Sequence, residues 1–259
     1  MLQKRQVEVL DRSGDRKSAI TTLTRDYPAG HTIPFHFHDR DQLVYASLGV
    51  MTVRTRDGTW VVPPHRAVWI PAEIPHTIAM SGAVAMRTLY LTSRLAKGLP
   101  RECCVISVSS LLKELILYAC SLRALKKTVA WQEQLMGVIL HQLKTVQMLP
   151  LQLPHLSDPR LVRISAIYIK DPSDDRTLAQ LCRVSGASKR SIERLFQREI
   201  GMTFGRWRQQ LRLMQGMRLL AEGAKVTDAA VESGYSTPSA FISMFKKTLG
   251  MTPTLYFKK

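Results

Sequence analysis

Acidic side chains are scarce in this 259-residue sequence, which holds 20 Asp and Glu against 37 Lys and Arg and carries a net charge of +17. Such an imbalance favours a polyanionic partner, either nucleic acid or an anionic membrane surface. The alternative is a basic surface that is solvated and has no partner. The charge alone therefore indicates a class of partner and no specific activity.

Cysteine and long apolar runs are also lacking. Four cysteines are too few for a disulfide scaffold, and none has the C-x-x-C spacing of a zinc site or a redox pair. No uninterrupted apolar run approaches the length of a membrane span, and residues 1–17 lack the apolar core of a signal peptide. We therefore expect a soluble, reduced, cytoplasmic protein with no membrane partner.

Residues 19–93 have the pattern of short β-strands. Segments such as LVYASLGVMTVRT (43–55) and TWVVPP (59–64) are rich in Val, Tyr, Thr and Trp, and turn residues separate them at regular intervals. Asp57-Gly58 lies between these two segments and is a strong hairpin signal. Many short strands without intervening helices predict a β-sandwich or β-barrel.

The hydrophobic period changes near Val108. Leucine-rich stripes with helical spacing run through residues 111–125 and 135–146, and they predict two amphipathic helices. These stripes are too apolar to face water alone, so they pack within one chain or mediate self-association. The proline-rich stretch PLQLPHLSDP (150–159) then predicts a linker, and everything after Asp158 is helical in pattern.

The C-terminal part contains an internal repeat, since LCRVSGASKRSIERLFQREIGMT (181–203) matches AAVESGYSTPSAFISMFKKTLGMT (229–252) with one extra residue in the second copy. Each copy predicts a helix, a tight turn and a second helix. Gly186 and Gly234 are placed to adopt the positive φ of the turn. A repeated helical bundle without a ligand is the alternative to a pair of DNA-binding units.

Other residues of the repeat have matching structural roles. Ser188 and Ser236 are expected to cap the second helices, and Phe196 and Phe245 to anchor them in the core. A helix over residues 203–222 would span about 30 Å between the copies. This is close to one turn of B-DNA, about 34 Å, so both second helices can enter successive major grooves on one face of the duplex.

Residues 158–257 resemble the DNA-binding domain of AraC-family transcription regulators. The resemblance is strongest over VTDAAVESGYSTPSAFISMFKKTLGMTPTLYF (226–257). The resemblance implies an activator or repressor that binds double-stranded DNA and works with RNA polymerase. It also implies that the helices starting near Ser188 and Ser236 are the recognition helices. The side chains expected to contact DNA are Ser188, Lys189, Arg190, Ser191, Glu193, Arg194, Ser236, Thr237, Pro238, Ser239, Ser243, Lys246 and Lys247.

Base recognition is expected to depend mainly on the first recognition helix. Arg190 and Arg194 are one helical turn apart, and arginine can bind guanine through two hydrogen bonds. Glu193 either accepts a hydrogen bond from a cytosine amino group or pairs with a neighbouring arginine, and the pairing is favoured. The second helix presents Ser and Thr, while Lys246 and Lys247 are phosphate contacts or solvated charges.

The stretch PFHFHDRDQLVYASLGV (34–50) brings histidines and polar residues together. It resembles the first motif of cupin β-barrels, G-x5-H-x-H-x3-E-x6-G, with Gln42 in place of the acid. The segment PAEIPH (71–76) resembles the second motif, P-x-G-x2-H, with Glu73 in place of glycine. In metal-binding cupins the positions equivalent to His36, His38, Gln42 and His76 converge on one ion.

The residues of this pocket are compatible with more than one kind of ligand. Three imidazoles with a neutral amide oxygen can hold zinc, iron, nickel or manganese, but losing the carboxylate lowers the affinity for a hard dication. An organic effector bound by the same polar residues is the alternative, and no cofactor is certain. Aromatic residues that alternate with polar neighbours suit a small, partly apolar ligand or the packing of the core equally well; they are Phe35, Tyr45, Trp60 and Trp69.

These observations predict an α+β protein of two domains, an N-terminal cupin-like β-barrel with a helical connector and a C-terminal all-α double helix-turn-helix. The expected boundaries are 1–105 for the sensor, 106–156 for the connector and 157–259 for the DNA-binding domain. The expected function is a non-enzymatic, DNA-binding transcription regulator controlled by a small molecule in the cupin pocket. The alternatives are a cupin metalloenzyme tethered to a basic helical domain, and a metal-ion sensor.

Overall fold

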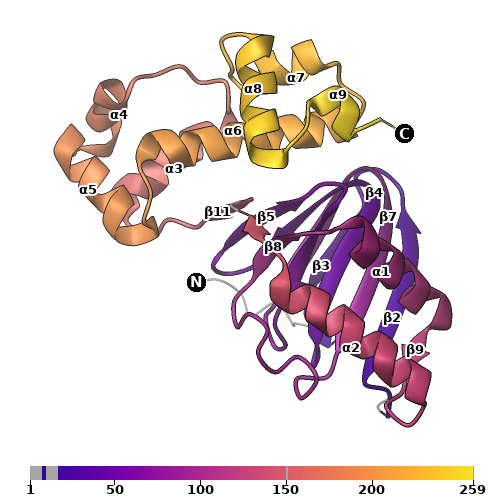
Figure 1. Cartoon of the computed structure of the whole chain (residues 1–259). Coiled ribbons are helices and arrows are strands. Elements are labelled where there is room, and N and C mark those ends of the chain that lie inside the picture. Colours follow the sequence, from indigo (N-terminus) through magenta and orange to yellow (C-terminus); the bar gives the residue numbers. More distant parts are fainter. Residues whose placement is uncertain (1–7, 10–16, 150, 259) are drawn as a thin grey trace. The chain divides into compact units, whose positions relative to one another are not determined.

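The computed structural model of the protein describes residues 8–9, 17–149 and 151–258, which form two compact units, Met1–Gln152 and Leu153–Lys259 (Figure 1). Residues 1–7 and 10–16 of the predicted sensor, and Lys259 of the predicted DNA-binding domain, lie outside the described residues. Residues 1–17, which lack the apolar core of a signal peptide, therefore lie mostly outside the described residues too. Within the part that is described, no helix combines the length and apolarity needed to cross a membrane.

The first unit is built on an antiparallel sheet, as the strand pattern of residues 19–93 predicts. Its central strands are the two longest, β4 and β7, which pair with each other along almost their whole lengths. The strands are β1 (Glu8–Val9), β2 (Ile20–Tyr27), β3 (Thr32–Phe37), β4 (Asp41–Arg54), β5 (Gly58–Val62), β6 (Arg66–Ile70), β7 (His76–Leu91), β8 (Cys104–Ser107), β9 (Ala124–Leu125), β10 (Met148–Leu149) and β11 (Gln152–Pro154).

Each of the two long strands changes its second neighbour midway. Strand β4 pairs with β6 in its first half and with β5 in its second half, and β4 and β5 form the hairpin predicted at Asp57-Gly58. Strand β7 pairs with β3 near its start and with β2 over its second half. The central β4–β7 pair is therefore flanked by different strands along its two halves, and β3 lies beside the start of β7.

Glycine is required where strand β4 is irregular. The β4–β7 register shifts on both sides of Leu48, and the adjacent Gly49 has a φ of +76°. A Cβ atom at Gly49 would lie 2.3 Å from the carbonyl oxygen of Ala83 and 2.8 Å from Cγ2 of Val84. No side chain fits there, because the two strands approach too closely at this point.

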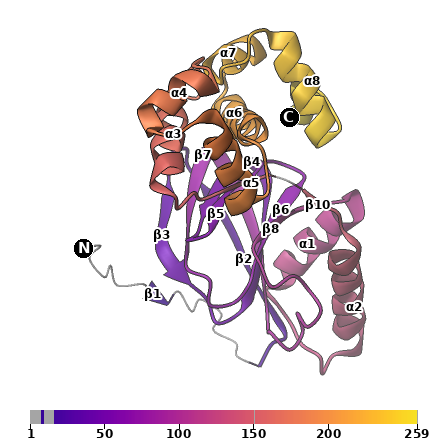
Figure 2. The same cartoon turned by 90° about the vertical axis from the view of Figure 1, so that its left-hand side faces the viewer.

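The two predicted amphipathic helices are α1 (Ser110–Leu122) and α2 (Ala130–Thr145), and both pack on one side of the sheet (Figures 1 and 2). They share a hydrophobic core with Leu43 and Tyr45 of β4 and with Leu89 and Leu91 of β7. Because side chains alternate along a strand, Gln42 and Tyr90 lie on the opposite side of the sheet from these helices. Because of this alternation, Gln42 and Tyr90 face the interior of the sensor.

The second unit is helical. Its helices are α3 (Pro159–Lys170), α4 (Leu178–Ser185), α5 (Lys189–Ile200), α6 (Phe204–Ala221), α7 (Val226–Glu232), α8 (Pro238–Leu249) and α9 (Pro253–Tyr256). Helices α4 and α5 form one helix-turn-helix unit, α7 and α8 form the other, and α6 connects them. The predicted fold class is confirmed, with an antiparallel sheet-rich N-terminal domain and a C-terminal helix-turn-helix region.

The core and turns of both helical units agree with the repeat. Phe196 is fully buried against Phe204 and Trp207, and Phe245 is fully buried against Phe241 and Tyr256. The turn glycines have the expected positive φ, +68° at Gly186 and +83° at Gly234. The repeat in the sequence therefore corresponds to a repeat in the packing.

One predicted helix cap is wrong. Ser188 caps α5 as expected, because its hydroxyl accepts a hydrogen bond from the backbone N–H of Ser191. The cap of α8 is Thr237 and not Ser236, since the Thr237 hydroxyl accepts from the backbone N–H of Ala240. The extra residue of the second repeat thus lies in the turn between Gly234 and the cap.

Candidate functional site

Helix α5 has an apolar inner face and a polar outer face. Ile192, Leu195 and Phe196 are buried in the core of the unit. Lys189, Arg190, Glu193 and Arg194 are exposed on the other side, as expected for a surface that contacts a large partner. Ser191 is half-buried, and its hydroxyl lies 3.0 Å from the hydroxyl of the capping Ser188.

The two arginines of α5 are available for an external partner. In the described part of the chain, Arg190 and Arg194 take part in no hydrogen bond or ion pair. Glu193 pairs with Lys189, with 3.9 Å between Oε1 and Nζ, so the predicted pairing with a neighbouring arginine is wrong. This pair is weak, because both side chains are more than half exposed. The spacing of four residues explains the partner, since it places the two side chains on one face of the helix.

Helix α8 repeats this arrangement with different side chains. Phe241, Phe245 and Leu249 are buried, and Pro238 occupies the first turn. The exposed side chains of the helix and its preceding turn include Ser236, Thr237, Ser239, Ser243, Lys246 and Lys247. Counted from the two caps, Ser239 and Ser243 occupy the positions of Arg190 and Arg194. The structure thus places every residue of the predicted DNA-contacting set on or beside α5 and α8.

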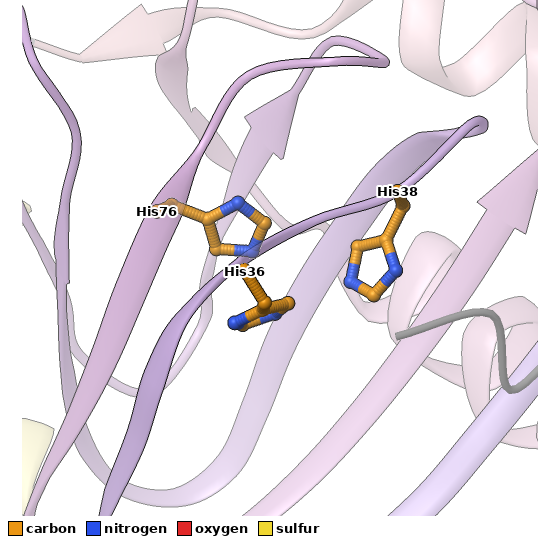
Figure 3. Close-up of side chains that lie close together, drawn as sticks. All are labelled: His36, His38 and His76. Atoms are coloured by element: carbon orange, nitrogen blue, oxygen red, sulfur yellow. The ribbon is translucent and has the colours of Figure 1, made fainter. Parts of the chain in front are cut away.

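The predicted pocket histidines come together in the first unit. Figure 3 shows the rings of His36, His38 and His76 close to one another, and the potential ligand atoms of the three lie within 4.8 Å of each other. His36 on β3 and His76 at the start of β7 are register partners across the two strands. His38 follows directly after β3. All three side chains are buried, with exposed fractions of 2%, 8% and 1%.

Backbone carbonyl groups fix the orientation of two of these rings. Nδ1 of His36 lies 2.7 Å from the carbonyl oxygen of Pro34, and Nδ1 of His76 lies 2.9 Å from that of Ile74. A carbonyl oxygen only accepts hydrogen bonds, so both rings carry their proton on Nδ1. Burial and the proximity of His36 lower the pKa of His76 to about 3, so this imidazole is neutral at neutral pH.

Gln42 lies on the strand next to this cluster, and it faces Tyr90 in the β4–β7 register. Its Nε2 donates to the Tyr90 hydroxyl over 3.4 Å, and Tyr90 also makes an edge contact with the His38 ring. Within the described residues, the buried Oε1 of Gln42 accepts no hydrogen bond. Sequence reasoning did not identify Tyr90, although the alternation of β7 would have placed it on the interior side.

The aromatic residues considered for the pocket are divided between two environments. Tyr45 and Trp69 belong to the hydrophobic core beneath α1 and α2, and Nε1 of Trp69 donates to the carbonyl oxygen of Pro100. Packing therefore explains these two residues. Trp60 is buried on β5, while Phe35 is 37% exposed.

Comparison with known families matches both parts of the chain. Residues 19–197 match the model described as an AraC-like ligand binding domain, and residues 181–259 match the model described as a helix-turn-helix domain. The first match covers more than half of the sequence. Together the two models account for the sheet with its polar interior and for the repeated helical units.

Individual relatives agree with these matches. The HTH-type transcriptional regulator NimR of Escherichia coli is 32% identical over 228 residues, which cover 88% of this chain and 83% of NimR. The HTH-type transcriptional activator RhaR of Mannheimia succiniciproducens is 35% identical over 85 residues, covering 32% of this chain and 31% of RhaR. The crystal structure of ToxT from Vibrio cholerae matches 92% of this chain and 97% of its own with 12% identity and a TM-score of 0.39. The chain belongs to the AraC family and is a transcription regulator with a ligand-binding domain and a DNA-binding helix-turn-helix region.

Proposed function

We propose that α5 and α8 are the two recognition helices and that α5 determines most of the base preference. The observation that carries this proposal is the pair of exposed arginines on α5, Arg190 and Arg194, at positions where α8 has Ser239 and Ser243. Arginine can bind guanine with two hydrogen bonds, whereas serine contacts bases and phosphates alike. Lys246 and Lys247 near the end of α8 supply contacts to the phosphate backbone.

The proposal also assigns roles to the rest of the chain. Residues 1–105 sense a small molecule in the pocket beside His36, His38, Gln42 and His76, residues 106–156 connect, and residues 157–259 bind DNA. Occupancy of the pocket changes the affinity for DNA, and the bound regulator acts on RNA polymerase. The chain works in the cytoplasm, where the chromosome lies, and catalyses no reaction; its transcription-regulator relatives support this assignment.

Mapping of the sites that the protein occupies on its own genome tests this proposal. We expect discrete sites that share a motif with two parts about one helical turn of DNA apart, because α6 separates the two helix-turn-helix units. A double variant, Arg190→Ala with Arg194→Ala, is expected to lose enrichment at these sites. Occupancy that is uniform along the genome, and unchanged in the double variant, would contradict sequence-specific binding by α5.

The exposed faces of α1 and α2 support a homodimer. Leu111 and Tyr118, seven residues apart on α1, are 53% and 51% exposed, and Trp131 of α2 is 46% exposed. Large apolar groups at helical spacing on one surface are typical of a contact with a second chain. We expect light scattering on the full chain to give the mass of a dimer.

Replacing Leu111 with lysine is expected to shift this mass to that of a monomer, because a charge in the contact loses its hydration. Leu48→Lys is the matched control, since Leu48 is 45% exposed but lies on β4. A wild-type monomer at high micromolar concentration, or equal dissociation of both variants, would show that this face does not join two chains.

A further inference from the structure

We propose that the first unit carries a second ligand site, a pocket between β2 and the end of α1 that binds a small oxyanion through Arg87 and Arg123. The ligand class is a phosphate ester or a dicarboxylate. This pocket lies on the side of the sheet that α1 and α2 cover, whereas Gln42 and Tyr90, beside the histidine cluster, face the other side. The inference therefore goes beyond the function proposed for the interior pocket.

A cavity of about 500 Å³ lies at the C-terminal end of α1, where this helix packs against β2 and β7 (Figure 1). Its polar lining comes from Thr22 and Thr24 of β2, Arg87 of β7, Ser121 of α1, and Arg123 directly after α1. Among the lining residues that the structure describes, none is acidic. Hydroxyl and guanidinium groups donate hydrogen bonds, so this lining favours a negatively charged ligand.

The alternation of the strands places these polar groups beneath the edge of α1. Ile20 of β2 and Leu89 of β7 belong to the hydrophobic core that α1 and α2 cover. Side chains two residues further along each strand point to the same side, which puts Thr22 and Arg87 there as well. Thr24 faces Arg87 directly in the β2–β7 register. The apolar core therefore ends at a polar edge, and apolar packing does not explain the arginine.

Arg87 has hydrogen-bond donors to spare. Its Nη1 donates to Oδ1 of Asp26 over 2.9 Å and to the carbonyl oxygen of Met86 over 2.8 Å. Within the described residues, its Nε and Nη2 donate no hydrogen bond. Arg160 uses this same edge to bind both carboxylate oxygens of Asp158. Arg87 can therefore bind an oxyanion through two parallel N–H groups, although its side chain is only 19% exposed.

Arg123 is held in a backbone conformation that favours glycine. Its φ is +64°, whereas the residues that end α4, α5 and α8 with a positive φ are all glycines, Gly186, Gly201 and Gly250. The backbone N–H and the hydroxyl of Thr22 both donate to the carbonyl oxygen of Arg123, over 2.9 Å and 3.1 Å. A side chain at such a φ costs free energy, and strain of this kind is typical of ligand sites.

The fold makes no use of the Arg123 side chain. This side chain is exposed, and it forms no hydrogen bond or ion pair with any described residue. Glycine would satisfy the backbone better, so the guanidinium itself is the feature that the position supplies. Because Arg123 lines the same cavity as Arg87, the two cations can bind one ligand from two directions.

The buried part of the lining is neutral. Cys120 is 7% exposed, and its Sγ lies 3.9 Å from the carbonyl oxygen of Thr88. Burial raises the pKa of this thiol, so it stays protonated at neutral pH and does not repel an anion. Leu23 and Leu117 are half-buried and add apolar walls. They suit a short carbon chain that carries the oxyanion.

Calorimetric titration of the full chain with inorganic phosphate and, separately, with succinate tests the site. We expect saturable binding with a dissociation constant below about 1 mM for at least one of the two anions. Tighter binding of phosphate would assign a phosphate ester to the site, and tighter binding of succinate a dicarboxylate. Both results support an oxyanion site.

One variant separates binding from folding. Arg123→Gly removes the guanidinium and supplies the residue that a positive φ favours. We expect anion binding to weaken by about tenfold or more, because a hydrogen bond from a charged donor is lost, while the melting temperature does not fall. Arg25→Ala is the matched control, since Arg25 is exposed on β2 and does not line the cavity. It removes the same charge and is expected to change the affinity less than about twofold.

The inference is overturned if neither anion binds the wild type at millimolar concentration, or if Arg123→Gly binds both as tightly as the wild type does. It is also overturned if Arg25→Ala weakens binding as much, because the general positive charge of the protein would then hold the anion. A lower melting temperature of Arg123→Gly would show that the arginine serves the fold and would overturn the inference too. These measurements contain no DNA, so their failure leaves the proposed recognition helices untouched.

Discussion

Alanine at Arg194 is expected to relax base preference in one half of the DNA site and to change binding to non-matching DNA little. The guanidinium of Arg194 is exposed, takes part in no interaction among the described residues, and lies one turn from Arg190. A two-hydrogen-bond contact between arginine and guanine contributes about 1–3 kcal/mol of discrimination, roughly 5- to 150-fold in affinity ratio. Binding titrations of the full chain against single-base variants of a mapped site measure this ratio.

Lys246→Ala is the control for this experiment. A lysine that contacts a phosphate adds affinity without regard to sequence, so its loss should weaken binding to all DNA sequences equally. The slope of log affinity against log salt concentration should become shallower by about 0.9. If Arg190→Ala and Arg194→Ala both preserve base preference while Ser239→Ala abolishes it, then α8 reads the bases and our assignment of roles is reversed.

The cap of α8 shows where sequence reasoning reached its limit. Ser236 and Thr237 are adjacent and both are good capping residues, so propensity could not choose between them. The choice depends on where the chain leaves the turn after Gly234. The structure places the extra residue of the repeat before the cap, and this fixes which later residues of α8 correspond to Arg190 and Arg194.

The partner of Glu193 was wrong for a different reason. The sequence analysis considered only arginines as partners. Arg190 lies three residues before Glu193 and Lys189 lies four residues before it, and both spacings place two side chains on one face of a helix. The structure pairs Glu193 with Lys189. The consequence is functional, since both arginines stay available to contact DNA.

The sensor site was predictable in its members but not in its orientation. The spacing of His36, His38, Gln42 and His76 was visible in the sequence through the resemblance to cupin motifs, and the structure brings the three histidines together. The strand register, which the sequence did not reveal, places Tyr90 opposite Gln42. It is this pairing that decides which atom of the amide points into the cluster.

Gly234→Ala is expected to destabilise the second helix-turn-helix unit strongly. Gly234 has a φ of +83°, which costs a side chain about 1 kcal/mol. In addition, a Cβ atom would lie 2.6 Å from the carbonyl oxygen of Pro172 and 2.7 Å from Cα of Ser173. This segment cannot move away easily, because Arg212 donates hydrogen bonds to the carbonyl oxygens of Pro172 and Asp174. The overlap should therefore add about 2 kcal/mol.

Gly186→Ala is the matched control in the first helix-turn-helix unit, because its φ is +68° and a Cβ atom there would meet nothing within 4 Å. The two variants share the backbone penalty and differ only in the overlap. Differential scanning calorimetry of the full chain is expected to show the helical unit melting roughly 10 °C lower in Gly234→Ala than in Gly186→Ala. Equal melting temperatures would mean that the segment at Pro172 moves aside without any loss of stability. In that case, only the backbone conformation would require glycine in these turns, and the close approach at Gly234 would contribute nothing to the requirement.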